Sequence, residues 1–176
     1  MQIGAGRFKG RRLPRVRAAR PVGARLKKSL FDILRNDLEG ARVLDLFCGV
    51  GALGLEALSR GAAHVTFVDV DGGALSAIGA FVDEVGAGSE AGFERRDLVR
   101  HGLPAGAFDL VFLDPPFALW STAAGSALLL AARERLSAGG RLVVKRPRQG
   151  PKAAPEAGWL RRTEAGDVEA ALFGPA

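Results

Sequence analysis

Apolar residues along this chain fall into short runs that alternate with longer amphipathic stretches. The short runs are apolar on both faces and rich in Val, Leu and Phe, which is typical of buried parallel strands. The predicted strands span residues 42–46, 64–68, 93–96, 108–113 and 141–145, the third being the least apolar. Apolar positions spaced by three to five residues, and glycine stops, predict helices over residues 24–38, 52–60, 72–85 and 126–136.

Residues 147–158 interrupt this alternation. They contain three prolines and two glycines, which predicts a loop. Beyond them, apolar runs over 159–163 and 168–173 flank Gly166-Asp167 and predict an antiparallel hairpin. Because strands that alternate with helices form parallel sheets, we expect an α/β fold with a mostly parallel seven-stranded sheet and helices on both faces. A turn is expected at Gly139-Gly140.

The composition excludes several classes of protein. A chain of 176 residues, 48% hydrophobic and 25% charged, is typical of a single soluble globular domain. Cys48 is the only cysteine, and the two histidines, His64 and His101, lie far apart in the sequence, so neither a disulfide framework nor a zinc site is expected. No run of 18 apolar residues and no apolar signal core is present. We therefore expect a cytoplasmic protein without a bound metal.

Positive charge is concentrated at one end of the chain. Residues 1–28 hold ten basic residues and no acidic one, although the whole chain has a formal net charge of only +6. Apolar residues and a turn at Lys9-Gly10-Arg11 predict a small basic hairpin over residues 1–23, in front of a single domain over 24–176. We expect residues 1–20 to be removable without loss of the fold. A nucleic acid is the favoured partner, with a solubilising terminus as the alternative, and the candidate contacts are Arg7, Lys9, Arg11, Arg12 and Arg20.

A glycine turn follows the first predicted strand. Residues 49–54 read Gly-Val-Gly-Ala-Leu-Gly, and Asp69 ends the next strand twenty residues after Gly49, so the pattern satisfies a dinucleotide fingerprint. Asp45, however, precedes the turn by four residues, where a carboxylate would repel a pyrophosphate. A ligand with a cationic amino-acid end suits this position instead. We predict S-adenosylmethionine, with its ammonium at Asp45 and its ribose at Asp69; a turn without a ligand is the alternative.

A second motif follows the strand over 108–113. Asp114-Pro115-Pro116-Phe117 lies at the carboxyl end of that strand, where open parallel sheets bind ligands. The two prolines stiffen the turn, which leaves the Asp114 carboxylate and the Pro115 carbonyl as rigid acceptors beside the flat ring of Phe117. Acceptors and a stacking ring suit methylation of an exocyclic amine on a base. The alternative is a capped turn with Phe117 in the core.

With these motifs the sequence resembles the class I S-adenosylmethionine-dependent methyltransferases, and among them the RsmD family, which methylates the N2 amine of a guanine in 16S ribosomal RNA. The resemblance rests on VLDLFCGVGALGLEALSRGA (43–62), FVDVD, FDLVFLDPPF, the terminal GDVEAALF and the basic segment over residues 3–13. It implies a Rossmann-like fold. It also implies site residues: Asp45, Gly49 and Gly51 for the methionine part of the cofactor, Asp69 for the ribose, Asp97 and Leu98 for the adenine, and Asp114, Pro115 and Phe117 for the target base.

The sequence departs from the family pattern at several positions. Lys27-Lys28 stand where the family commonly has an acid, and Val50 stands where serine is usual. Two other functions stay open: a DNA adenine-N6 methyltransferase, because this turn serves any exocyclic amine, and a non-enzymatic RNA-binding protein on the same fold. We interpret Cys48 as a packing residue. Trp120 could equally enclose the base or start the next helix. A contact with phosphate and a place in a solvated loop are equally consistent with Lys145, Arg146 and Arg148.

Overall fold

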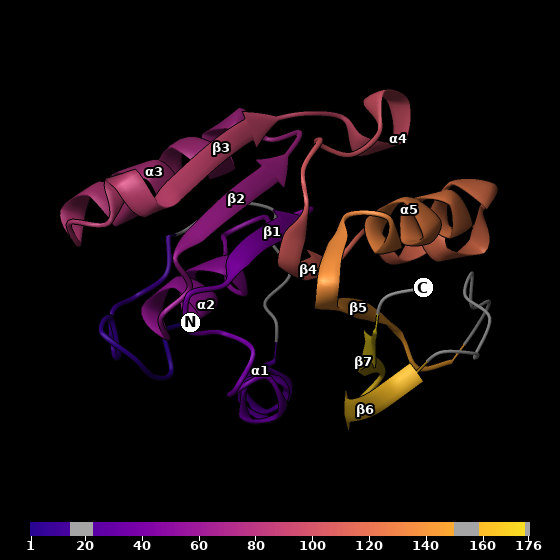
Figure 1. Cartoon of the computed structure of the whole chain (residues 1–176), viewed down its shortest axis with the longest axis horizontal. Helices are drawn as coiled ribbons and strands as arrows, with labels where there is room; N and C mark the ends of the chain where they lie inside the picture. Colours follow the sequence, from indigo (N-terminus) through magenta and orange to yellow (C-terminus); the bar gives the residue numbers. More distant parts are fainter. Residues whose placement is uncertain (15–22, 150–158, 175–176) are drawn as a thin grey trace.

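The centre of the molecule is a seven-stranded sheet with the strand order β3-β2-β1-β4-β5-β7-β6 (Figure 1). A computed structural model describes residues 1–14, 23–149 and 159–174. Every pair of neighbouring strands is parallel except the two pairs that include β7. The predicted mostly parallel α/β sheet is therefore confirmed. The strands are β1 (Arg42–Leu46), β2 (His64–Asp69), β3 (Ala91–Arg95), β4 (Phe108–Leu113), β5 (Leu136–Pro147), β6 (Trp159–Ala165) and β7 (Val168–Phe173).

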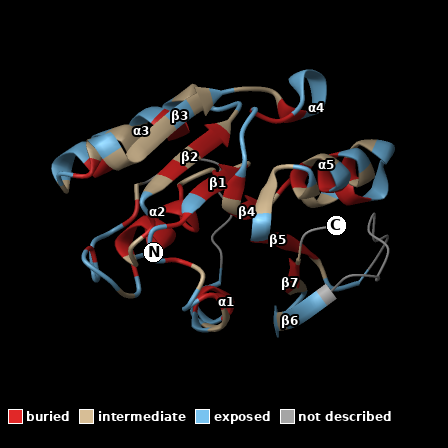
Figure 2. Ribbon diagram, in the orientation of Figure 1, coloured by how far each residue is buried: buried red, intermediate tan, exposed pale blue. Residues whose placement is uncertain are grey.

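Helices cover both faces of this sheet, and each face has its own core. Successive residues of a strand point to opposite faces, so Val43 of β1 packs in one cluster and Leu44 in the other. Figure 2 shows the central strands as mostly buried. The first core is covered by α1 (Ala24–Ile33), α2 (Gly54–Ser59) and α3 (Gly72–Glu84), and the second by α5 (Ala123–Arg133) with α4 (Leu98–His101) beside it; η1 (Gly88–Glu90) and η2 (Phe117–Ser121) are short 3-10 turns.

Three local predictions differ from the structure. The helix predicted over 126–136 is α5, Ala123–Arg133, because Leu136 already begins β5. The helix expected over 24–38 ends at Ile33, although Leu34 and Leu38 stay buried in the turns that follow. The spacing of the apolar residues therefore indicated which positions are buried, but not where the helix ends. Gly139-Gly140 is not a turn but lies inside β5, where the pairing with β4 shifts register. Gly139 has a φ of +79°, which suits a bulge that lets the strand start early. Among the described residues, no helix is both long and apolar enough to span a membrane.

The basic segment begins with a hairpin that packs into the domain. The Ile3 amide donates to Arg11 O at 3.0 Å, and the Gly10 amide donates to Ile3 O at 2.9 Å. Ile3, Phe8 and Leu13 are buried in the cluster that also contains the core side chains of α1. The expectation that this segment can be removed without loss of the fold is therefore not supported. The division at residue 23 stays a prediction, since residues 15–22 lie outside the described part.

Glu56 of α2 anchors this hairpin. Its carboxylate is fully buried and accepts hydrogen bonds from the backbone amides of Gly4 (2.8 Å) and Ala5 (3.0 Å). It also pairs with Lys27 and Arg60, each at 2.8 Å. Burial alone would raise the pKa of Glu56, but these hydrogen bonds and cations outweigh it and hold the pKa below its usual value. Lys27, a departure from the family pattern, thus has a structural role.

Candidate functional site

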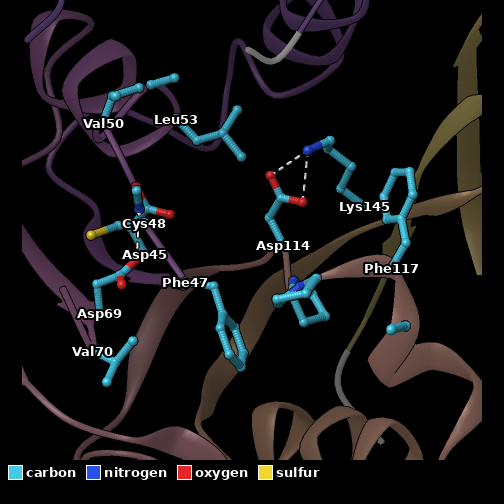
Figure 3. A pocket seen from close by; sticks show the side chains of 15 residues that line it. Asp45, Phe47, Cys48, Val50, Leu53, Asp69, Val70, Asp114, Phe117 and Lys145 are labelled. Carbon is cyan, nitrogen blue, oxygen red and sulfur yellow. Dashed lines mark hydrogen bonds and ion pairs between the residues drawn. The ribbon is translucent and has the colours of Figure 1, made fainter. Parts of the chain in front are cut away.

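A cavity of about 560 Å³ opens at the carboxyl ends of the central strands, a volume within the range of small-molecule sites. The turns after β1, β2 and β4 and the end of β5 form its walls. In Figure 3, Asp45 and Asp69 lie on one side and Phe117 on the other, with Asp114 and Lys145 between them. Six of the predicted site residues line this cavity together: Asp45, Gly49, Asp69, Asp114, Pro115 and Phe117.

Asp45 provides a buried carboxylate at the floor of the cavity. It lies in β1 with only 2% of its surface exposed, and one oxygen accepts a hydrogen bond from the Gly54 amide at 2.9 Å. Burial raises the pKa of Asp45 to about 7, and the negative charges of Asp114 and Asp69 act in the same direction. A cationic ligand group next to Asp45 would lower this pKa again and favour the ionised carboxylate.

The glycine turn is shaped by contacts that a side chain would disturb. The Gly49 amide donates to Asp69 at 2.8 Å, and the other oxygen of that carboxylate accepts from the Asp71 amide at 3.0 Å. Gly51 does not line the cavity; it has a φ of +70°, and a β-carbon there would lie 3.0 Å from Ile78. A β-carbon at Gly54 would lie 2.4 Å from Phe67. These glycines therefore let α2 start close against the sheet.

Asp97 and Leu98 lie apart from the main cavity. The Asp97 side chain caps α4 by accepting from the Val99 and Arg100 amides at 3.1 and 3.2 Å, and Leu98 is buried in the core under α5. Asp97 does line a second hollow of about 510 Å³, which shares Val70 with the main cavity. The adenine role implied for Asp97 and Leu98 stays a prediction.

The Asp-Pro-Pro-Phe turn brings Asp114 against Lys145 of β5. The ammonium donates to both carboxylate oxygens, with 2.7 Å to Oδ1, and lies 5.9 Å from the centroid of the Phe117 ring. Burial raises the pKa of Asp114, and the attraction of Lys145 opposes that rise. The Asp114 side chain is only 18% exposed and that of Lys145 11%, so this ion pair is largely buried in the wall of the cavity.

Lys145 and Phe47 are site residues that the sequence reading did not assign. The sequence signal for Lys145 is its place at the end of a predicted strand. Its pairing with Asp114 depends on register: β4 and β5 are parallel with Leu113 opposite Val144, which brings the following residues, Asp114 and Lys145, side by side. Phe47 carried no such signal. It lines the cavity with a φ of +58°, the one positive φ outside glycine in the described chain, and such strain is concentrated at functional sites.

Three other residues considered as candidates from the sequence occupy positions that suit packing or pairing within the protein. Cys48 borders the cavity, but burial raises its pKa strongly, so the thiol stays protonated. Trp120 is 2% exposed in the core under α5 and does not line the cavity. Arg146 is also buried, paired with Glu169 at 2.6 Å, which leaves it unavailable to phosphate.

The predicted nucleic-acid contacts of the hairpin lie at the opposite edge of the sheet. Arg7 pairs with Glu90, directly before β3, and Arg11 pairs with Glu84 at the end of α3 at 2.7 Å. Lys9 and Arg12 are exposed, and neither forms an ion pair with a residue that the structure describes. Arg20 lies outside the described residues. Glu90 directly precedes β3, whereas the cavity lies beyond the carboxyl ends of the strands, so at least the length of β3, roughly 16 Å at about 3.3 Å per residue, lies between them.

The charge of the cavity lining indicates its ligand. Within the described lining, three carboxylates face one ammonium: Asp45, Asp69 and Asp114 against Lys145. A pyrophosphate would be repelled there, whereas a ligand with a cationic amino acid and a sulfonium would be attracted. A site with these carboxylates beside a stiff acceptor turn and an aromatic ring can hold a cationic methyl donor and a flat amine side by side.

Comparisons with known proteins agree with this geometry. The family described as Conserved hypothetical protein 95 matches residues 1–174. Ribosomal RNA small subunit methyltransferase D of Haemophilus influenzae is 32% identical over 89% of this chain and 83% of its own length. The Escherichia coli protein of the same name is 34% identical over 66% of this chain and 60% of its own. A solved structure of Escherichia coli yhhF, provisionally described as a methyltransferase, has a TM-score of 0.84 at 29% identity, covering 99% of this chain and 97% of its own.

Proposed function

Because this chain belongs to the family described as Conserved hypothetical protein 95, that of the RsmD methyltransferases, we propose that it methylates the exocyclic N2 amine of a guanine in small-subunit ribosomal RNA. S-adenosylmethionine, when bound, supplies an electrophilic methyl group. Methylation of ribosomal RNA is supported by the names of the relatives. The guanine and its N2 amine go beyond those names, and they rest on the family resemblance and on the chemistry of the Asp114 turn.

One observation carries the proposal: Asp114, Pro115 and Phe117 share a cavity with Asp45 and Asp69. The two cofactor carboxylates suit the cationic end and the ribose of S-adenosylmethionine. The cofactor site and the acceptor turn lie at one sheet edge, so donor and acceptor molecules can meet without a large movement of the chain.

Asp114 and Phe117 would prepare the amine for attack. The lone pair of an exocyclic amine is delocalised into the base, so the amine is a weak nucleophile. Hydrogen bonds from its two N–H groups to the Asp114 carboxylate and the Pro115 carbonyl would orient the nitrogen. Phe117 would stack on the base. As the N–C bond forms, the sulfonium C–S bond would break and S-adenosylhomocysteine would leave, and the methylated nitrogen would release one proton to solvent.

The RNA is proposed to reach beyond the cavity to the basic hairpin. Lys9 and Arg12 are the preferred candidates for phosphate contacts in the hairpin, because Arg7 and Arg11 already pair with acidic side chains. The RNA would have to extend past at least the length of β3, roughly 16 Å at about 3.3 Å per residue, to contact both the cavity and the hairpin. A cytoplasmic location follows from the proposed substrate.

Methyl transfer to defined nucleic acids tests this proposal. Small-subunit ribosomal RNA, naked and assembled into particles, is taken from cells that lack the endogenous enzyme and incubated with tritiated S-adenosylmethionine. Digestion to nucleosides should yield labelled N2-methylguanosine, and Asp114→Asn should abolish most of the label. Labelled N6-methyladenine in unmethylated DNA would favour the DNA methyltransferase instead. RNA binding with no affinity for the cofactor would favour the non-enzymatic alternative.

A further inference from the structure

Lys145 contacts both side chains that are proposed to handle the target amine. Its ammonium donates to both oxygens of Asp114, at 2.7 Å to Oδ1, and lies 5.9 Å from the centroid of the Phe117 ring (Figure 3). Only 9% of Lys145 is exposed. It therefore belongs to the wall of the cavity and not to the solvated surface.

The charges around Asp114 explain why it needs a cation. Asp45 faces the cavity from the end of β1 and Asp69 from the end of β2, whereas Lys145 faces it from β5. Burial and the nearby carboxylate of Asp45 disfavour a second negative charge, and Lys145 favours it. Within the described lining, Lys145 is the one cation that can perform this task.

An ionised Asp114 is what the proposed chemistry requires. A carboxylate has about four acceptor positions, whereas a protonated carboxyl group presents an O–H donor in place of one of them. Lys145 occupies one position on each oxygen, which leaves acceptor capacity for the N–H groups of an amine. Hydrogen bonds to an ionised acceptor are also shorter and stronger, so the amine is held in a narrower range of orientations.

We propose that Lys145 is a positioning residue of the methyl-transfer site, which keeps the Asp114 carboxylate ionised and oriented and holds the Phe117 ring beside it. This inference rests on the proposed function for its catalytic meaning. Its physical content, the coupling of Lys145 to Asp114, does not depend on which nucleic acid is methylated. The two ideas can therefore fail separately.

The first experiment measures Asp114 in the full chain without substrate. Carbon-13 NMR of the aspartate carboxyl groups is followed against pH in wild type and in Lys145→Met, with Asp114→Asn used to assign the signal. Arg141→Met is the matched control. It also removes one positive charge from β5, but at a position four residues, or about 13 Å, from Lys145. The apparent pKa of Asp114 should rise in Lys145→Met and stay at the wild-type value in Arg141→Met. An unchanged Asp114 titration in Lys145→Met would overturn the inference.

The second experiment measures single-turnover methyl transfer against pH with saturating cofactor. Lys145→Met should still bind S-adenosylmethionine, and with the cofactor saturating it should react slower by up to about 10²-fold near neutral pH, the scale of a misplaced reacting group. Its rate should recover in part at higher pH, where Asp114 ionises without help. Lys145→Arg keeps the charge and should restore the acid limb of the profile. A wild-type rate and pH profile in Lys145→Met would refute the positioning role.

Folding and function are controlled separately. Thermal melting with and without the cofactor reports whether each variant is folded, and Lys145→Gln replaces Lys145→Met in both experiments if the methionine variant does not fold. If wild type transfers no methyl group to ribosomal RNA, the proposed function fails. The NMR titration still decides whether Lys145 controls Asp114.

Discussion

Replacing Glu56 by glutamine should destabilise the whole domain, although residue 56 lies outside the cavity. Glu56 is fully buried and is the shared partner of two backbone amides, Lys27 and Arg60. Glutamine keeps the shape but loses the charge and presents one acceptor oxygen where there were two. The buried ammonium of Lys27, only 6% exposed, would then lack its counter-charge.

The magnitude follows from the loss of one partner in a buried ion pair, which costs about 3–5 kcal/mol. Total stabilities of single domains are roughly 5–15 kcal/mol, so Glu56→Gln should leave the protein marginally folded. Urea unfolding followed by circular dichroism measures the change. Glu84→Gln is the matched control: it breaks the hairpin ion pair with Arg11, but the Glu84 side chain is 67% exposed, and the change should stay within about 0.5 kcal/mol.

The pH dependence gives the same prediction a second test. The folded-state pKa of Glu56 lies below its usual 4.5, so the unfolded chain takes up the proton first as the pH falls. The stabilisation by Glu56 is therefore complete above about pH 4.5 and is lost as the pH falls through the folded-state pKa. The difference between wild type and Glu56→Gln should shrink in that range. Equal small losses in Glu56→Gln and Glu84→Gln at neutral pH would refute the idea that Glu56 anchors the hairpin.

Three further predictions concern the cavity and the hairpin. Asp45→Ala should weaken S-adenosylmethionine binding by about 1–3 kcal/mol, the scale of a lost charge-assisted hydrogen bond; in wild type the affinity should fall as the pH drops below about 7, the pKa of Asp45, and calorimetry at several pH values measures both. Asp114→Asn should leave cofactor affinity unchanged but slow methyl transfer steeply, and an equal loss of both would give Asp114 a different role. Changing Lys9 and Arg12 together to glutamine should reduce the salt slope of RNA binding by up to about 0.9 per lost phosphate contact, and filter binding with an unaltered slope would assign these cations to the solvated surface.

The strands and the two motifs are local properties, so the sequence determined them well. A buried parallel strand needs a run rich in apolar residues on both faces, and β1, β2 and β4 each have one. A strand-to-helix turn that closes against the sheet needs glycine, as Gly54 shows with 2.4 Å to Phe67 for an added β-carbon. An acidic turn at a strand end needs only its neighbours in the chain, so Asp114-Pro115-Pro116-Phe117 was recognisable without coordinates.

Tertiary structure alone decided which charges meet. Lys145 and Asp114 are 31 residues apart, and Glu56 lies more than 50 residues from the hairpin amides that it binds. Their pairing depends on strand register and on which face each helix buries, neither of which is a property of a short segment. The basic hairpin illustrates the same limit. Its charge suggested a removable arm, whereas Ile3, Phe8 and Leu13 are buried in the core. Their burial depends on helices that are distant in the sequence, so a short segment could not show it.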